Sequence, residues 1–297
     1  MIKPDFICTD KLLSRYSTLG IGGEADFFAK IESQARLLEA LEFAKSEDLD
    51  TFIIGRGSNI LFSDEGFRGL VLKIYMKRMH HFVPQDELLV EAGALVSAVV
   101  DLGMETGFTG FENFAGLPGT VGGAIYGNAG CFGSEFWERV RAAKFFDGKD
   151  FGEINLSEQP APHSYRSSIF KEHPNWTIIS ASLKIEEADS KLVAKKVGEV
   201  VYQRSKKQPQ VKSVGCIFEN PVRDGKRVSA GKLIDETGLK GARIGNAEIS
   251  PVHANFFVNL GGATANDFIE LIKLARGRVF EKFKIVLKEE IIRVGVF

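Results

Sequence analysis

The sequence predicts a soluble globular chain that mixes helices and strands in two parts. Its 297 residues are enough for one large or two ordinary domains, and 44% hydrophobic with 26% charged residues is the balance of a folded, water-soluble protein. Strand-like and helix-like patterns follow one another through the first two thirds. The polar run DSKLVAKK, residues 189–196, then joins an all-β-looking region to a new set of elements, so we place a domain boundary there.

The first part begins with a strand, helix and strand unit. Its pattern predicts, in order, a helix at 33–47, strands at 51–54, 70–74 and 87–92, and a helix from Ser97 to Thr106. Ser33 can cap the first helix with its hydroxyl, and apolar residues recur along it at helical spacing. Gly107 can end the second helix. These elements indicate a small α/β unit at the N-terminus.

The remaining elements are predicted by alternation and by capping residues. They are strands at 139–146 and 177–185, a charged helix at 189–207, a short helix from Gly231 to Glu236, a β pair around 248–250 and 253–260, a helix from Ala265 to Lys282 and a strand at 289–294. Asp147 and Gly148 indicate a hairpin turn after the first strand. Thr264 can cap the long helix, with Asp267 near its positive end.

Charge and composition exclude several classes of function. The 38 basic and 39 acidic residues give a net charge of -1, so we expect neither a nucleic-acid nor an anionic-membrane partner. No apolar run approaches the roughly 18 residues of a membrane span, and the polar start lacks a signal-peptide core, so we expect a cytoplasmic protein. The three cysteines and five histidines lack disulfide-framework or metal-ligand spacing, so we expect no metal.

Glycine is the unusual component. A chain of this length carries about 21 glycines at an average usage of about 7%, and this one has 31. Ten of them fall between Gly103 and Gly133, and the segment 116–130 (GLPGTVGGAIYGNAG) has six glycines and no charged residue. So much glycine weakens a helix or a strand. We therefore predict a loop whose backbone approaches a cofactor; the alternative is a flexible connection.

A second candidate loop is GRGSN, residues 55–59, directly after a predicted strand. Its glycines let backbone amides turn toward an anion, while Ser58 and Asn59 add donors for phosphate oxygens. It is neither a P-loop nor a dinucleotide fingerprint, because it lacks the Gly-Lys-Ser/Thr and third-glycine positions. Residues 20–25 (GIGGEA) do fit the loose dinucleotide-binding pattern G-x-G-x-x-G/A. We discount this match, because the pattern should be followed by a helix and the next residues look like a strand. An ordinary turn is the alternative for GRGSN as well.

Single residues add further candidates. Arg166, between an aromatic residue and two hydroxyls, could present a fixed cation to a carboxylate, and its alternative is a surface strand residue. Cys216 could donate a proton, since the pKa of a thiol, about 8.5, lies near working pH. The alternative is that Cys216 is a core residue, because free cysteines are often buried. Of Glu289 and Glu290, only one can face a pocket from a strand. A hydrolase triad of Cys216, His253 and Glu290 has no supporting motif.

Eight segments in order resemble the UDP-N-acetylenolpyruvoylglucosamine reductase (MurB) family over nearly the whole chain. No single segment is decisive, but the eight in sequence are highly specific. They are TLGIGGEADFF (18–28), IGRGSNILFSDEGFRGLVL (54–72), GFENFAGLPGTVGGAIYGNAGCFGSE (110–135), SYRSSIF (164–170), QRSKKQP (203–209), GCIFENP (215–221), AGKLIDETGLKGARIGNAEISPVHANFFVN (230–259) and LKEEIIRVG (287–295). The length resembles the shorter class of the family.

The resemblance implies an α+β fold of the PCMH and vanillyl-alcohol-oxidase type. It implies a FAD-binding region at 1–188, in two lobes at about 1–75 and 76–188, and a substrate domain at 189–297. It also implies an NADPH-dependent enzyme of peptidoglycan synthesis. Flavin hydride adds to one vinyl carbon of the enolpyruvyl sugar nucleotide, and an enzyme acid protonates the other. The implied partner is this small molecule, and we expect a monomer.

The resemblance also assigns site residues. Arg166 and Glu290 match the polarising residues, and Cys216 stands at the proton donor, which is normally serine in this family; a thiol donates at least as readily but can be alkylated or oxidised. Tyr165, Lys207 and Asn220 match substrate or NADPH positions, and Asn255 matches more weakly. The implied FAD-binding residues are Gly55, Arg56, Gly57, Ser58, Asn59, Gly116, Pro118, Gly119, Thr120, Gly122, Gly123, Asn128, Ala129 and Gly130.

Two rival functions stay open at this point. Another flavoprotein oxidase of the same fold commonly tethers flavin through histidine, and no histidine lies between Asp26 and Met79. A flavin-binding module without catalysis would have no reason to keep Arg166, Cys216 and Glu290 together. The sequence leaves the nicotinamide preference, the extent of domain closure and the role of Cys131 undecided. Bulk at Gly122 or Gly123 is expected to abolish flavin retention.

Overall fold

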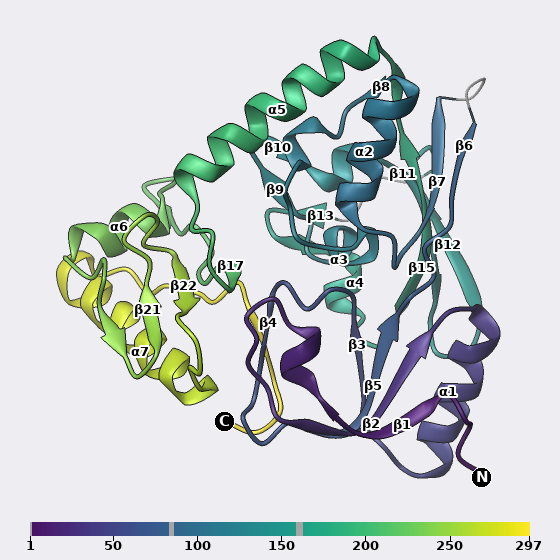
Figure 1. Cartoon of the computed structure of the whole chain (residues 1–297), viewed down its shortest axis with the longest axis horizontal. Coiled ribbons are helices and arrows are strands. Elements are labelled where there is room, and N and C mark those ends of the chain that lie inside the picture. The colour runs from purple at the N-terminus through teal and green to yellow at the C-terminus, as the bar shows by residue number, and fades with distance from the viewer. Residues whose placement is uncertain (1, 83–85, 159–162) are drawn as a thin grey trace. The chain divides into compact units, whose positions relative to one another are not determined.

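The chain folds into two compact units, each assembled from separate stretches of sequence. The computed structural model describes residues 2–82, 86–158 and 163–297 (Figure 1). Unit 1 consists of Met1–Ile7, Ala29–Arg56 and Leu72–Gln203, and unit 2 consists of Cys8–Phe28, Gly57–Val71 and Arg204–Phe297. Four elements continue along the chain from one unit into the other: β1 (Ile7–Leu12), β2 (Glu24–Ile31), β5 (Phe67–Ile74) and α5 (Ser190–Lys207). A four-stranded sheet has the order β1-β2-β5-β3, with β3 at Thr51–Ile54.

Unit 1 is built on an antiparallel five-stranded sheet with the order β12-β11-β15-β7-β6 (Figure 1). Its strands are β6 (Met79–Phe82), β7 (Glu87–Glu91), β11 (Val140–Phe146), β12 (Phe151–Asn155) and β15 (Thr177–Lys184). The central strand β15 is buried from Thr177 to Leu183, so both of its faces are covered. Helix α3 (Val121–Tyr126) packs against β15 and β7, which places the glycine-rich segment directly on this sheet.

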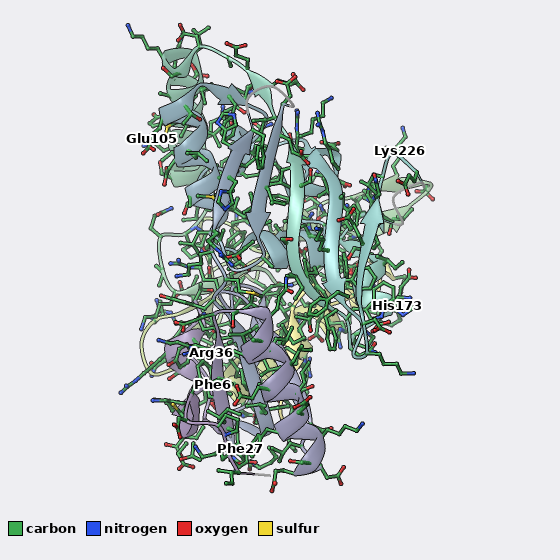
Figure 2. All side chains as sticks on the ribbon, turned by 90° about the vertical axis from the view of Figure 1, so that its right-hand side faces the viewer. Phe6, Phe27, Arg36, Glu105, His173 and Lys226 are labelled. Atoms are coloured by element: carbon green, nitrogen blue, oxygen red, sulfur yellow. The ribbon has the colours of Figure 1, made fainter. Side chains whose placement is uncertain are left out.

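The other elements of unit 1 are short, apart from two helices. They are α1 (Gln34–Ser46), α2 (Val96–Thr106), α4 (Ile169–Glu172), β8 (Phe108–Thr109), β9 (Gly130–Cys131), β10 (Ser134–Glu135), β13 (His163–Ser164), β14 (Ser167–Ser168), β16 (Glu186–Glu187), η3 (Glu112–Phe114) and η4 (Phe136–Arg139). Helix α1 begins where Ser33 Oγ accepts the Arg36 N–H at 3.2 Å. The Arg36 guanidinium lies 5.2 Å from the ring centre of Phe6, and both are labelled in Figure 2. This contact fixes the segment before β1 on the helix.

Unit 2 combines a smaller sheet, of order β17-β22-β21-β20, with two helices. Its elements are η1 (Leu13–Tyr16), β4 (Ile60–Phe62), β17 (Ser213–Cys216), β18 (Val222–Arg223), β19 (Lys226–Arg227), α6 (Ala230–Glu236), β20 (Arg243–Ile244), β21 (Ala247–Ile249), β22 (Phe256–Asn259), α7 (Ala265–Phe283) and β23 (Ile292–Val294). One core holds the unit together, with Phe218 from the segment after β17, Phe257 from β22 and Phe268 from α7 buried in it. Strand β23 pairs in parallel with β4.

Most of the predicted elements are confirmed within one to three residues. The caps hold as well: Gly107 has φ +77°, and Thr264 and Asp267 bond each other's backbone N–H groups at 3.1 and 3.0 Å. The prediction that 116–130 is all loop is wrong, because Val121–Tyr126 form α3. The helix persists despite its glycines because Thr120 caps it and the sheet packs against it. Strand β4 was not predicted. None of the helices in the described ranges is long and apolar enough to cross a membrane.

Candidate active site

The residues that the sequence assigns to a site fall in both compact units. Unit 1 holds Gly55, Arg56, Tyr165, Arg166 and every candidate of the glycine-rich segment 116–130. Unit 2 holds Gly57, Ser58, Asn59, Lys207, Cys216, Asn220, Asn255 and Glu290. The GRGSN loop is therefore divided between the units after Arg56.

In unit 1, the first glycine of GRGSN lies against the start of α3. A Cβ built on Gly55 would lie 2.3 Å from Thr120 Oγ1, so only glycine permits this approach. The same Thr120 oxygen accepts the Gly123 N–H at 3.3 Å and caps the helix. Two segments that were separate candidates in the sequence, about 65 residues apart, are therefore in direct contact, and the Arg56 side chain beside them is exposed.

The two adjacent glycines of α3 face different surroundings. Gly122 is buried, and a Cβ there would lie 2.8 Å from Ala92 Cβ and 3.1 Å from the Ala92 carbonyl oxygen. Gly123 is exposed, and a Cβ there would meet only Thr120 Oγ1, at 3.4 Å. Gly122 is thus required by packing of the helix on unit 1 itself. Gly123 gives α3 a surface without side chains that a flat ligand could approach.

The two ends of the glycine-rich segment also differ in exposure: two residues before α3 are exposed, whereas Asn128 after it is buried. Before α3, Gly116 has φ +74° and is exposed, as is Pro118, while the Gly119 carbonyl accepts the Val96 N–H at 3.0 Å. After α3, Asn128 is fully buried. Its amide donates to Glu135 at 2.8 Å and to the Ser164 carbonyl at 2.9 Å, and its oxygen accepts the Trp137 N–H at 3.3 Å.

Ala129 continues this internal bonding, since its N–H donates to Ala124 and its carbonyl accepts from Phe136, both at 2.8 Å. Asn128 and Ala129 therefore shape the end of the segment with their own hydrogen bonds. Cys131 follows, and its Sγ donates to the Asn113 carbonyl at 2.9 Å. This thiol is half-buried and is tied to the segment that precedes the glycine-rich run.

Arg166 is held against the end of the same segment. It occupies the turn between β13 and β14 with φ +57°, an uncommon conformation for a residue with a side chain. Its guanidinium donates to the carbonyls of Gly130 at 3.0 Å and Asn128 at 3.5 Å, and lies 4.9 Å from the ring centre of Tyr165. Two carbonyl oxygens and a neighbouring ring thus help to fix the position of this cation.

In unit 2, the second half of GRGSN is tied to the N-terminal segment and to the last strand. Gly57 has φ +69°, and a Cβ there would lie 2.1 Å from the Tyr16 carbonyl oxygen. Its carbonyl accepts the Thr18 N–H at 3.1 Å. Asn59 Nδ2 donates to the Glu290 carbonyl at 3.0 Å, and the Asn59 carbonyl accepts the Ile292 N–H at 3.0 Å. The half-buried Ser58 lies between these anchored residues.

Cys216 and Glu290 lie on neighbouring segments of unit 2. Cys216 ends β17, and the next residue, Ile217, accepts the Glu290 N–H at its carbonyl at 2.8 Å. On the other side, the Ile217 N–H donates to the Asn255 carbonyl at 2.8 Å. The buried Asn255 side chain bonds both backbone groups of Phe218, at 3.0 and 2.8 Å. Asn255 therefore fixes the backbone directly after Cys216.

The remaining unit 2 candidates serve different purposes. Asn220 Oδ1 accepts the Ala230 N–H at 2.9 Å at the start of α6. Lys207 is exposed at the end of α5. His253 Nδ1 accepts the Asn255 N–H at 3.2 Å, and burial lowers the pKa of its imidazole. Among the residues that the structure describes, no three His, Cys, Asp or Glu side chains gather as metal ligands would.

Lys73 and Thr18 hold the GRGSN loop in place, and neither was predicted from the sequence. Lys73 Nζ donates to the Gly55 carbonyl at 2.7 Å, and burial, with help from Lys77 and Arg56, lowers its pKa to about 8. A lysine inside the apolar strand sequence LVLKI was the available signal. Thr18 Oγ1 donates to the Ser213 carbonyl at 2.7 Å, so it joins the second half of GRGSN to β17. Thr18 is far from Gly57 and Ser213 in the sequence, so no sequence pattern indicated this link.

Comparisons with protein families match both parts of the chain. Residues 25–153 match the family described as FAD binding domain. Residues 203–294 match the family described as UDP-N-acetylenolpyruvoylglucosamine reductase, C-terminal domain. The two matches cover the GRGSN loop and the glycine-rich segment in the first case, and Cys216, Asn255 and Glu290 in the second.

Similar proteins extend the likeness over nearly the whole chain. The UDP-N-acetylenolpyruvoylglucosamine reductases of Rubrobacter xylanophilus and Caldicellulosiruptor saccharolyticus are 35% and 37% identical to it, over 96% and 97% of this chain and 94% and 92% of theirs. The crystal structure of UDP-N-acetylenolpyruvylglucosamine reductase (MurB) from Thermus caldophilus superimposes with a TM-score of 0.79 at 34% identity, covering 98% of this chain and all of that one.

Proposed function

Because the chain belongs to the UDP-N-acetylenolpyruvoylglucosamine reductase family, we propose that it reduces UDP-N-acetylglucosamine enolpyruvate to UDP-N-acetylmuramate, with FAD as cofactor and NADPH as reductant. An oxidoreductase with a FAD-binding domain is what this family membership establishes. The observation that carries the finer proposal is the direct pairing of the segment after Cys216 with Glu290.

The residues of unit 1 fit a flavin. A ligand with a flat ring needs a surface free of side chains, and the exposed Gly123 on α3 has one. A pyrophosphate needs donors and cations nearby, and Arg56, with the half-buried Lys73 that bonds the Gly55 carbonyl, supplies positive charge at that end. In unit 2, Ser58 and Asn59 are donors of the kind that phosphate oxygens accept. The other FAD-binding residues that the resemblance implies shape these two loops.

The chemistry requires a cation and a proton donor from the chain. Bound FAD supplies the hydride, which it receives from NADPH. When hydride adds to a vinyl carbon conjugated to a carboxylate, negative charge develops on the carboxylate and on the adjacent carbon. Arg166, bonded to two carbonyl oxygens, stabilises that charge, and Glu290 helps to polarise the enolpyruvyl group. The Cys216 thiol gives its proton to the adjacent carbon, and solvent restores the thiol.

Substrate recognition is assigned to residues around these groups. Tyr165 packs against the Arg166 guanidinium, and Lys207 is an exposed cation suited to a diphosphate. Asn255 orders the backbone directly after Cys216, and Asn220 binds the start of α6. In this proposal, residues 1–188 bind FAD and residues 189–297 form the substrate domain. The enzyme acts as a cytoplasmic monomer in peptidoglycan synthesis, and so contributes to cell wall biogenesis, cell shape and cell division.

Cys216→Ala tests the proton-donor role. We expect reduced flavin in this variant to be reoxidised by the enolpyruvyl sugar nucleotide at least about 100-fold more slowly, because general acid catalysis typically contributes 10²–10⁴. Cys216→Ser keeps a proton on the same position and should retain much of the rate. Flavin reduction by NADPH, followed separately by stopped-flow absorbance, should be unchanged in both variants.

Cys131→Ala is the matched control, since Cys131 is also a half-buried thiol but bonds the Asn113 carbonyl. It should behave as wild type in both half-reactions. Wild-type reoxidation rates in Cys216→Ala would refute the proton-donor role of Cys216. They would leave the proposed overall reaction unaffected.

A further inference from the structure

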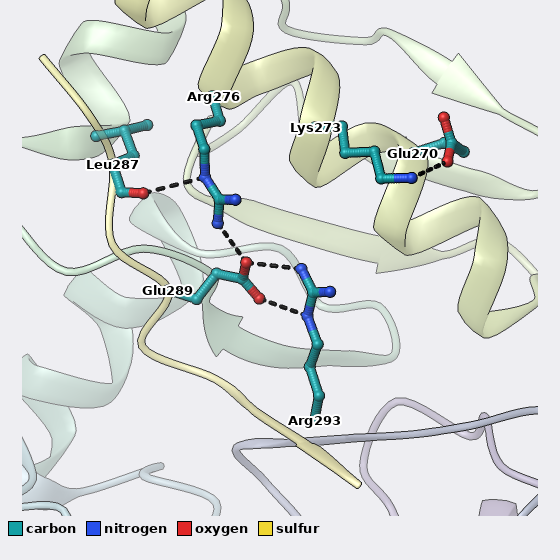
Figure 3. A network of polar contacts seen from close by, with 6 residues as sticks. All are labelled: Glu270, Lys273, Arg276, Leu287, Glu289 and Arg293. Carbon is teal, nitrogen blue, oxygen red and sulfur yellow. Dashed lines mark hydrogen bonds and ion pairs between the residues drawn. The ribbon is translucent and has the colours of Figure 1, made fainter. Parts of the chain in front are cut away.

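A carboxylate held by two arginines lies next to Glu290 in unit 2. Glu289 accepts from Arg293 at both of its oxygens, with Nε to Oε2 at 2.8 Å and Nη2 to Oε1 at 2.7 Å. Arg276 Nη2 bonds Oε1 as well, and its Nε donates to the Leu287 carbonyl at 3.2 Å (Figure 3). We call Arg276, Glu289 and Arg293 the arginine clamp. Only 16% of the Glu289 side chain is exposed, so solvent screens it little.

The arginine clamp joins three elements around the catalytic candidate. Arg276 comes from α7, Glu289 from the segment that pairs with Phe218, and Arg293 from β23 (Figure 3). The backbone of that segment is bonded on both sides of Glu289, because the Lys288 carbonyl accepts from Glu219 at 2.9 Å and the Glu290 N–H donates to Ile217 at 2.8 Å. The arginine clamp and these two backbone hydrogen bonds together therefore leave residues 288–290 little conformational freedom.

The direction of Glu290 follows from that of Glu289. In an extended, paired segment, successive side chains point to opposite faces. The paired backbone therefore directs Glu290 away from the face on which Arg276 and Arg293 hold the Glu289 carboxylate. The clamp also has an electrostatic effect. Two guanidinium groups carry twice the charge of one carboxylate, and without Glu289 they would attract the adjacent carboxylate, which is Glu290.

We propose that Glu289 is a positioning residue, which occupies Arg276 and Arg293 and so keeps Glu290 directed toward the substrate. This rests on the proposed function, in which Glu290 polarises the enolpyruvyl group. An ion pair that only stabilised the fold would affect unfolding and would leave the chemical step alone. The positioning role instead affects the half-reaction that uses Glu290 and spares the one that does not.

The decisive variant is Glu289→Gln in the FAD-loaded protein. It keeps the size of the side chain but leaves both arginines without their carboxylate. We expect the limiting rate of flavin reoxidation by the enolpyruvyl sugar nucleotide to fall at least 10-fold, because a misplacement of about 1 Å can cost 10² in rate. The KM for that substrate should change less than 3-fold, and NADPH should reduce the flavin at the wild-type rate. Glu289→Asp, which restores the charge, should recover part of the loss.

The control is Glu270→Gln on the same helix as Arg276. Glu270 pairs with Lys273 at 2.7 Å (Figure 3). Both of these side chains are exposed, so both half-reactions should stay as in wild type. Wild-type reoxidation in folded Glu289→Gln, or an equal loss in both half-reactions, would overturn the positioning role. If Glu289→Gln does not fold, Arg293→Lys decides by the same criterion. A wild-type protein that fails to transfer hydride to this substrate would instead refute the proposed function.

Discussion

The absence of a side chain at Gly130 lets the Arg166 guanidinium lie against the backbone. A Cβ on Gly130 would lie 2.7 Å from Arg166 Nη1 and 3.3 Å from the Ser134 carbonyl oxygen. Gly130 does not have a positive φ, so alanine is compatible with its backbone. The glycine is therefore explained by the approach of the guanidinium, which also bonds the Gly130 carbonyl.

Gly130→Ala should accordingly impair chemistry more than folding. The end of a flexible arginine can yield to a methyl group, so we expect a loss of stability below about 1 kcal/mol. Displacing the cation should slow reoxidation of reduced flavin by the enolpyruvyl sugar at least about 10-fold, since preorganised charges contribute strongly to such steps. Thermal unfolding and stopped-flow absorbance measure the two effects. A large fall in Tm with an unchanged rate would contradict this role.

Lys73 gives a prediction about pH. Burial, reinforced by Lys77, Arg56 and Lys30, lowers the pKa of its ammonium from the ordinary 10.5 to about 8. Between about pH 8 and pH 10.5 the folded chain has lost this proton while the unfolded chain keeps it, so the contribution of Lys73 to stability rises with pH. At pH 7 the group is charged in both states, and the folded state bears the cost of keeping this partly buried ammonium charged.

Lys73→Met, which cannot titrate, isolates this contribution. The free energy of unfolding of wild type relative to Lys73→Met should increase between pH 7 and pH 10, by roughly 2 kcal/mol after allowing for partial exposure. Urea denaturation of both proteins at the two pH values measures it, because the other titrating groups cancel in the comparison. A difference that stays constant with pH would show that Lys73 titrates normally.

At the scale of elements, α3 shows what local patterns can and cannot predict. Glycine disfavours helices, so a sequence with Gly122 and Gly123 inside a glycine-rich run predicts a loop. The helix forms because Gly122 lets it approach Ala92 on unit 1 and because Thr120 caps it. Longer elements such as α7 were predictable from their period and caps. The three-residue β4 was not, since it is defined by a distant partner, β23.

The two glycines of α3 give a matched pair of variants. Gly122→Ala places a methyl against Ala92 at 2.8 Å and should destabilise the apoprotein by about 1–3 kcal/mol. Gly123→Ala meets only Thr120 Oγ1 at 3.4 Å and should leave apoprotein stability equal or slightly higher, because alanine favours helices. If FAD lies against α3, Gly123→Ala should nevertheless weaken FAD binding at least 10-fold.

Thermal unfolding of the apoproteins and fluorescence titration with FAD separate these outcomes. Wild-type FAD affinity in Gly123→Ala would mean that the cofactor does not approach this side of the helix. Loss of affinity in Gly122→Ala alone would follow from its packing defect and would carry no information about the cofactor.

At the scale of the whole molecule, the site could be predicted where its residues are close in sequence. GRGSN and the segment 116–130 were recognisable because their composition is unusual. The residues that hold the site in place were not recognisable. Lys73, Thr18 and the arginine clamp act on partners that are distant in sequence or known only from the fold. The compact units are also discontinuous, whereas a boundary at residue 188 assumes contiguous domains, so that boundary stays a prediction.

Anaerobic half-reaction analysis of the wild-type protein tests the central claim most directly. The purified protein should be yellow or take up FAD, and NADPH should bleach the flavin. After removal of NADPH, UDP-N-acetylglucosamine enolpyruvate should restore the flavin absorbance with one equivalent of UDP-N-acetylmuramate formed, two hydrogens heavier by mass spectrometry. Reduced flavin that stays bleached in the presence of this substrate, but is reoxidised by oxygen, would contradict the proposed function.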